Sequence, residues 1–301
     1  MQIRAYRSHR LSRGRGAMPR RADPRADFTL PPRALGIPSS DAIDLLQGRA
    51  ASWPVRDQLG RNTCIAMALT AALELRQAGD RGAISLLSAE FLYDMIRTHC
   101  GPRDDSEKAA WDAGAVHMAD GVAMLAQFGI CPDQAMPYLS AKAAPKLPQT
   151  PPIPDNATRL AERHRSGNWT IWDYAAPPSN GQGAAATLIG LLQQGRPVAM
   201  SMPEFVRHHL SYWDNAATLD SGVVATPGPG WDSSGSAAHA VCVVGYQPDS
   251  NGGWFIFRNS LGCRFGSARN TMSIPLVPAA GFGAIAASHV DAYCYYMASP
   301  A

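Results

Sequence analysis

Cys64 and Gln58 are the first pair of residues whose types and spacing suit nucleophilic chemistry. Apolar residues recur every three or four positions from Cys64 through Leu75, which predicts a buried helix that begins at the cysteine. Unpaired backbone N–H groups and the helix dipole favour a thiolate at such a position. Gln58 lies six residues earlier, and its amide can fold back so that it and the Cys64 N–H hold a developing oxyanion. Taken alone, a cysteine in a buried helix is more often an inert core residue.

His239 and Asn259 form the second pair. An apolar strand follows His239 over residues 240–244, and another precedes Asn259 over residues 254–258. An antiparallel hairpin that turns near residues 249–250 would place residue 260 opposite His239, so the two side chains can meet at its open end. An asparagine carbonyl that accepts from one imidazole nitrogen would fix the tautomer and aim the other nitrogen at a thiol. This spacing favours a functional role for His239 over the usual structural role of an isolated polar residue at the start of a strand.

Other apolar patterns predict the elements that position these residues. The predicted helices cover residues 64–79, with Gly79 as the stop, 88–98, with Ser88 as the N-cap, 117–128, ended by Gly129, and 184–194. The predicted strands cover residues 197–202, 238–246, 253–258, 271–275 and 288–296. A proline-rich stretch over about 143–155 predicts an extended connector. Because helices dominate the first half and strands the second, we expect an α+β fold with two lobes and not a parallel α/β sheet.

The composition is that of a globular protein, with 46% hydrophobic and 17% charged residues and a net charge of +3. The charge is uneven, because residues 1–36 contain nine Arg and two Asp while the rest of the chain is mildly acidic. We expect residues 1–40 to be a disordered leader, shortened if translation starts at Met18, and residues 41–301 to form one domain. A nucleic-acid partner is not expected for this domain. No apolar run approaches roughly 18 residues and no signal-peptide core is present, so no membrane association is expected.

Several segments together resemble the papain-like (C1) cysteine peptidases in their order and spacing. The closest similarity is to the bacterial branch of that family, and it covers about residues 53–297. The main motifs are Pro54-Val55-Arg56-Asp57-Gln58 with Cys64, His239-Ala240-Val241 with Gly245-Tyr246, and Arg258-Asn259-Ser260-Leu261-Gly262 with Phe265-Gly266. The segments that fit between them are Leu87-Ser88-Ala89-Glu90-Phe91-Leu92-Tyr93 and residues 114–138.

The resemblance implies a helical left lobe, a right lobe built on an antiparallel barrel-like sheet, and a site in the cleft between them. It implies hydrolysis of peptide bonds through a thioester, with a peptide or protein substrate, no metal, no organic cofactor and a monomeric protein. The implied catalytic residues are Cys64 as nucleophile, His239 as general base and then acid, Asn259 as orienter of His239, and Gln58 as oxyanion donor. The implied substrate-binding residues are Gly114, Ala115 and Ala240.

The chain departs from the family pattern at several positions. Ile65 and Leu261 stand where the family usually has tryptophan, and Leu261 is expected to shield the His-Asn hydrogen bond less well. Arg61 stands where a disulfide cysteine is common, which favours a reducing, cytoplasmic location, with export by a specialised route left open. Cys64 and His239 are 175 residues apart, more than is usual. The leader is too short and too rich in Pro and Arg for the family's helical propeptide.

Three other interpretations remain. A catalytically silent module with this fold would bind peptides or a partner protein. A second interpretation retains the nucleophile but transfers the acyl group to a protein target, as an acyltransferase or transamidase. A zinc site built from His239, Cys242 and Cys263 is disfavoured, because strand alternation sends His239 and Cys242 to opposite faces and no CxxC pair is present.

Overall fold

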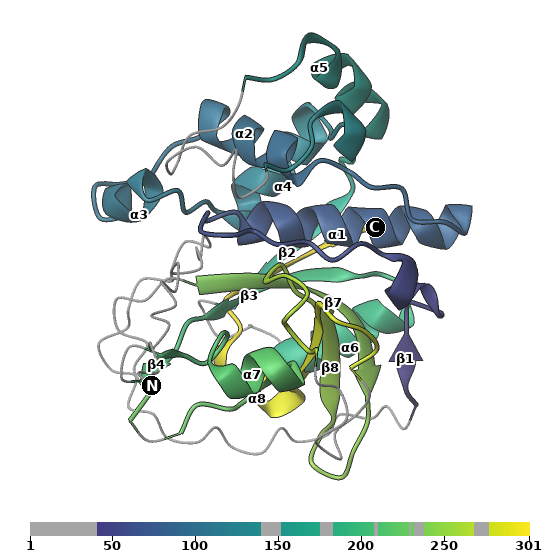
Figure 1. The fold of residues 1–301 in the computed structure, drawn as a ribbon, viewed down its shortest axis with the longest axis vertical. Coiled ribbons are helices and arrows are strands. Elements are labelled where there is room, and N and C mark those ends of the chain that lie inside the picture. The colour runs from purple at the N-terminus through teal and green to yellow at the C-terminus, as the bar shows by residue number, and fades with distance from the viewer. Residues whose placement is uncertain are drawn as a thin grey trace, which may run out of the picture.

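A computed structural model describes residues 41–139, 152–174, 183–207, 210–228, 230–231, 238–267 and 277–301. The predicted leader, the predicted strand 271–275 and most of the proline-rich connector lie outside these residues. Helices from the first half of the chain form one layer, and a mixed sheet with further helices forms the other (Figure 1). The α+β expectation is therefore confirmed.

The first layer is built from helices, and three of them match the helices predicted near residues 64–79, 88–98 and 117–128. Its α-helices are α1 (Cys64–Arg81), α2 (Ala89–His99), α3 (Lys108–Asp112), α4 (Met118–Gln127) and α5 (Asp155–Ala161), and its short 3-10 helices are η1 (Arg49–Ser52), η2 (Asp133–Ala135) and η3 (Glu162–His164). Ser88 caps α2 as predicted, since its hydroxyl oxygen accepts from the Phe91 N–H at 2.9 Å. No helix of the described residues is long and apolar enough to cross a membrane.

The end of α1 differs from the prediction. Gly79 lies inside the helix, and the helix ends before Gly82, whose φ of +79° is left-handed. The Gly82 N–H donates to the Ala78 carbonyl at 2.7 Å, so it caps the last turn. A helix tolerates an interior glycine at a cost of about 1 kcal/mol, whereas the left-handed cap favours glycine strongly.

The second layer is a sheet with β7 near its centre. The strand order is β2-β10-β3-β7-β8-β9-β6, with β1 paired to β7 and a separate β4-β5 pair, and the neighbours are antiparallel except β6 and β9. The strands are β1 (Ile43–Asp44), β2 (Trp169–Asp173), β3 (Val198–Pro203), β4 (Val206–Arg207), β5 (Leu210–Ser211), β6 (Val223–Val224), β7 (Ala238–Gln247), β8 (Trp254–Arg258), β9 (Phe282–Ala286) and β10 (Tyr296–Pro300). Three helices accompany it, α6 (Ala184–Gln193), α7 (Ala216–Ser221) and α8 (Ala287–Tyr293).

The predicted strand 288–296 is wrong. Residues 287–293 form α8, and the strand of this region is β10, over Tyr296–Pro300. The apolar residues Ala287 and Val290 lie three positions apart and are both buried, so the segment has a helical apolar face that its Tyr and Val content conceals. Packing of this face against α6 outweighs local strand propensity.

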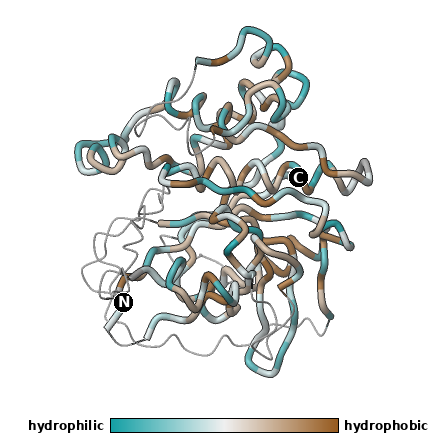
Figure 2. Tube along the Cα trace, viewed as in Figure 1, coloured by the Kyte–Doolittle hydropathy of each residue, from teal (hydrophilic) through white to brown (hydrophobic). Residues whose placement is uncertain are grey.

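Strand β7 separates two apolar cores. Before the bulge, its even-numbered residues, including Ala240 and Cys242, pack in the core that contains α1 and the other helices of the first layer. Its odd-numbered residues Val241 and Val243 pack in a second core with α6 and α8. Figure 2 shows hydrophobic residues concentrated along α1 and the central strands, and hydrophilic residues on the outer turns. Burial on both faces explains why β7 reads as a continuous apolar run.

Helix α8 carries a histidine within an aromatic enclosure. His289 is completely buried, with its ring centroid 6.4, 5.6 and 5.3 Å from those of Phe205, Tyr212 and Tyr293. Neither ring nitrogen has a hydrogen-bond partner among the described residues. Burial lowers the pKa of His289 to about 3, because a protonated imidazole would lose its hydration here.

We expect the protein to lose stability as the pH falls below about 6.5, because the unfolded chain then binds a proton that the folded His289 does not bind. The folded-state pKa of about 3 lies below the unfolded value, so the loss is complete near pH 3. It amounts to roughly 4–5 kcal/mol. Urea unfolding between pH 7 and 4 should show this slope in the wild type and in His99→Gln, an exposed-site control, but not in His289→Phe. A His289→Phe variant with the wild-type slope would contradict this assignment.

Candidate active site

The segment that leads into α1 lies alongside the residues that follow β8. The Gln58 N–H donates to the Ser260 carbonyl at 2.8 Å, and the Gly262 N–H donates to the Arg56 carbonyl at 3.1 Å. An isolated antiparallel bridge joins Asp57 to Leu261. The chain segment that carries Gln58 is therefore fixed against the segment that carries Ser260, although the two lie about 200 residues apart.

The side-chain amide of Gln58 is held in one orientation. Its Oε1 accepts from the Ser260 hydroxyl at 2.6 Å, and its Nε2 donates to the Arg61 carbonyl at 3.1 Å. These two bonds distinguish the carbonyl end from the amino end, so Nε2 faces the loop before Cys64. Cys64 is the first residue of α1, as predicted.

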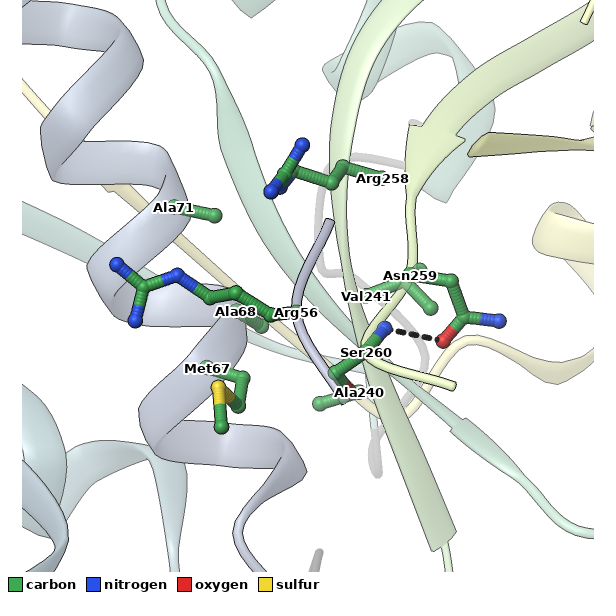
Figure 3. A pocket seen from close by; sticks show the side chains of 9 residues that line it. All are labelled: Arg56, Met67, Ala68, Ala71, Ala240, Val241, Arg258, Asn259 and Ser260. Carbon is green, nitrogen blue, oxygen red and sulfur yellow. Dashed lines mark hydrogen bonds between the residues drawn. The ribbon is translucent and has the colours of Figure 1, made fainter. Parts of the chain in front are cut away.

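His239 and Asn259 meet as the hairpin predicted. The distance between His239 Nε2 and Asn259 Oδ1 is 2.8 Å, and the same oxygen accepts from the Ser260 N–H at 2.8 Å (Figure 3). The Ser260 N–H can donate only to the oxygen of the Asn259 amide, so the atom that faces His239 is Oδ1. This oxygen can only accept a hydrogen bond, so His239 Nε2 must be the donor. The imidazole is therefore the tautomer with its hydrogen on Nε2, which leaves Nδ1 as the nitrogen able to accept a proton.

The register of the hairpin differs slightly from the predicted one. Cys242 pairs with Arg258, and the ladder shifts between Val243 and Gly245, where an extra residue is accommodated. Such a bulge moves every later pairing by one position. Continuing the Cys242 pairing to the open end places residue 261, and not 260, opposite His239, yet Asn259 still reaches the imidazole.

The four implied catalytic residues are shielded from solvent. Gln58, Cys64 and His239 have no exposed surface, and Asn259 is 3% exposed. A substrate carbonyl must touch the Cys64 sulfur to react, so neighbouring groups have to move before the substrate binds. The low dielectric of this environment strengthens the hydrogen bonds described above.

The structure also identifies a residue that the sequence did not single out. The ring of Trp213 lies against His239, with the centroids 4.8 Å apart and the planes at 63°. Leu261 packs in the same core and is completely buried. His239 and Asn259 are both buried, so their hydrogen bond is shielded from water, and the expectation that Leu261 shields it less well than a tryptophan stays a prediction. The sequence gives no sign of the Trp213 contact, since the residue lies in a loop with no regular pattern.

Two of the three implied substrate-binding residues, Gly114 and Ala115, already form backbone hydrogen bonds within the protein. The Gly114 N–H donates to the Trp111 carbonyl at 2.7 Å, and the Gly114 carbonyl accepts from the Tyr93 hydroxyl at 2.8 Å. The Ala115 N–H donates to the Ala110 carbonyl at 2.9 Å. A substrate backbone would have to compete with these internal bonds. Ala240 follows His239 on β7 and is almost completely buried.

A small cavity of about 10 Å³ lies between α1 and the β7–β8 pair. In Figure 3 Met67, Ala68 and Ala71 lie on α1, Ala240 and Val241 lie on the sheet side, and the Arg258 side chain extends from the sheet side toward α1. Such a cavity holds no more than about one water molecule. The residues that line it are Arg56, Met67, Ala68, Ala71, Ala240, Val241, Arg258, Asn259 and Ser260. Because Cys64 and His239 do not line it, this cavity is not the place where a substrate carbonyl would meet the thiol.

All six cysteines are free, and three of the other five are buried in ways that make them unreactive. Burial raises the pKa of the Cys242 and Cys294 thiols far above the ordinary range, and that of Cys131 to about 11. Cys242 belongs to the core on the α1 side of β7, while Val241 and Val243, which share strand parity with His239, belong to the other core. Within the described residues, no three His, Cys, Asp or Glu side chains gather in a way that could hold a metal ion.

Comparisons with known proteins agree with this geometry. The sequence pattern described as "Papain family cysteine protease" matches residues 39–271. Xylellain, a cysteine protease from Xylella fastidiosa, is similar in structure with a TM-score of 0.63 and 21% identity over 96% of both chains. A search among curated protein sequences found no match.

Two further solved structures show the same fold. Digestive procathepsin L 3 of Tenebrio molitor has a TM-score of 0.57 and 19% identity, covering 97% of this chain and 76% of its own. Bromelain from Ananas comosus, solved with the E64 inhibitor, has a TM-score of 0.51 and 18% identity, covering 86% of this chain and 97% of its own. Because the family pattern spans most of the chain, the protein belongs to the papain family of cysteine proteases and is a peptidase with the papain-like fold.

Proposed function

We propose that the chain hydrolyses peptide bonds with Cys64 as nucleophile, His239 as general base and acid, Asn259 as orienter and Gln58 as oxyanion donor. The observation that carries this proposal is the hydrogen bond between His239 Nε2 and Asn259 Oδ1, fixed by the Ser260 N–H. It selects the tautomer in which Nδ1 can take the thiol proton. A cysteine at the start of a long helix supplies the matching nucleophile.

The reaction proceeds in two halves. The Cys64 sulfur gives its proton to His239 Nδ1 and attacks the peptide carbonyl, forming a C–S bond while the carbonyl oxygen becomes negative. The Cys64 N–H and the Gln58 Nε2 amide stabilise this oxygen as hydrogen-bond donors. The C–N bond then breaks as His239 protonates the leaving amine. Water, deprotonated by His239, next attacks the thioester and releases the acid and the thiol.

The substrate is a peptide or protein, and no metal or organic cofactor takes part in these steps. Gly114, Ala115 and Ala240 are proposed to contact the substrate once the internal hydrogen bonds of Gly114 and Ala115 yield. None of the six cysteines forms a disulfide, which is in keeping with a reducing, cytoplasmic compartment. We also propose that the protein acts as a monomer. A silent binding module would have no use for the oriented His239 tautomer, which argues for the enzyme over that alternative.

Labelling with a peptidyl epoxide tests the proposal. The wild type, reduced and at neutral pH, should gain one adduct on Cys64 by mass spectrometry, although Cys64 is buried and Cys263 is exposed. An unspecific reagent such as iodoacetamide should label Cys263 first. Modification of Cys263 alone by the epoxide would show that Cys64 is not an activated nucleophile and would overturn the proposal.

A further inference from the structure

Trp213 is packed tightly against the base of the proposed mechanism. It lies between β5 and α7 and is completely buried. Its indole N–H donates to the Pro203 carbonyl at 3.3 Å, and its ring lies 5.9 Å from that of Phe257. These contacts fix the indole plane, so the ring 4.8 Å from His239 is a rigid neighbour of the imidazole.

The imidazole is therefore held by two different groups. Asn259 accepts from Nε2 in the ring plane, and Trp213 contacts the ring at 63° to that plane. A tilted arrangement of this kind lets the imidazole present its edge to the indole face, where the ring quadrupole stabilises a positive charge, and the effect grows when both groups are removed from water. His239 carries a positive charge whenever it holds the proton of Cys64. Leu261, buried in the same core, can exclude water but has no such quadrupole.

We infer that Trp213 is a positioning residue for the proposed reaction, which orients the His239 imidazole and stabilises its protonated form, so that the thiolate of Cys64 persists to higher pH. This inference rests on the proposed function. Under this inference Trp213, a loop residue outside the Cys-His-Asn-Gln set, extends the pH range of activity at its alkaline end.

The pH dependence of inactivation by a peptidyl epoxide tests the inference, because it follows the thiolate–imidazolium pair directly. We expect Trp213→Leu to move the alkaline limb of the rate to lower pH by about 0.5 to 1 unit. We also expect kcat for peptide hydrolysis to fall several-fold with little change in KM. Phe255→Leu is the matched control, since it removes a buried aromatic ring of the same core that packs on Tyr246, and its alkaline limb should stay in place.

A shape-preserving change keeps the test decisive if Trp213→Leu fails to fold. A fluorinated tryptophan placed at position 213 keeps the packing but weakens the negative face of the ring. The alkaline limb should again move to lower pH. An unmoved limb in this variant, or equal shifts in Trp213→Leu and Phe255→Leu, would overturn the inference. Failure of the proposed function would look different, since wild-type Cys64 would then not be labelled at all.

Discussion

Cys64→Ala should lose peptide hydrolysis, with kcat reduced on the order of 10⁶-fold, because no other group can form the thioester. Cys64 is a small, fully buried residue at the first position of α1, so removing one sulfur should leave the fold intact. Rates with a casein or peptide substrate, alongside circular dichroism, measure both effects. Gln58→Ala should lose less, about 10²–10³-fold in kcat, because it removes one donor to the oxyanion and leaves the nucleophile in place.

Cys131→Ala is the matched control for Cys64→Ala. Cys131 is also completely buried in the helical layer, but burial raises the pKa of its thiol to about 11, so it carries no thiolate at neutral pH. Its activity should stay within about twofold of the wild type. A Cys64→Ala variant with the same activity as Cys131→Ala would reject the assigned nucleophile.

Glu90→Gln should destabilise the protein by about 3–5 kcal/mol, because it leaves the Arg61 guanidinium buried without its counter-charge. Arg61 and Glu90 form two parallel bonds, of 2.5 and 2.6 Å, and their side chains are 2% and 0% exposed. Burial lowers the pKa of Arg61, but the hydrogen bond to Glu90 and the neighbouring charges outweigh it, so the net shift is upward. Urea unfolding at pH 7 measures the loss. Tyr93 and Tyr138 lie against the guanidinium but cannot replace the carboxylate.

Two comparisons show whether the effect comes from a buried charge. Replacing both partners, Arg61→Met with Glu90→Leu, should recover most of the stability, since no unpaired charge remains. Breaking the exposed pair Lys108–Asp112 with Lys108→Ala should cost no more than about 0.5 kcal/mol. If Glu90→Gln costs as little as Lys108→Ala, the buried pair does not stabilise this region.

The elements predicted well are those whose pattern is local. The apolar period of α1, the Ser88 cap and the apolar runs of β7 and β8 each specify their structure within a few residues. The region of α8 failed because its aromatic and β-branched residues favour a strand, while the packing that makes it a helix comes from α6, about 100 residues earlier. The Gly79 stop failed because sequence alone does not show which glycine takes a positive φ.

The candidate site shows the same division. The His239–Asn259 pairing could be predicted because one hairpin determines it, even though the bulge shifts the register by one residue. The roles of Ser260 and Trp213 could not, since each depends on residues brought together from distant parts of the chain. The buried ion pair between Arg61 and Glu90 could not be predicted either, because Glu90 is supplied by a separate helix, α2.

The attachment of residues 53–58 to residues 258–262 also ties together the two halves of the proposed catalytic set. Backbone bonds join Gln58 to Ser260 and Arg56 to Gly262, and Arg258 adds bonds to the carbonyls of Trp53 and Pro54. A displacement that separated Gln58 from Asn259 would have to break these bonds first. The spacing between the proposed oxyanion donor and the proposed histidine orienter is therefore maintained by hydrogen bonds that take no part in the proposed reaction.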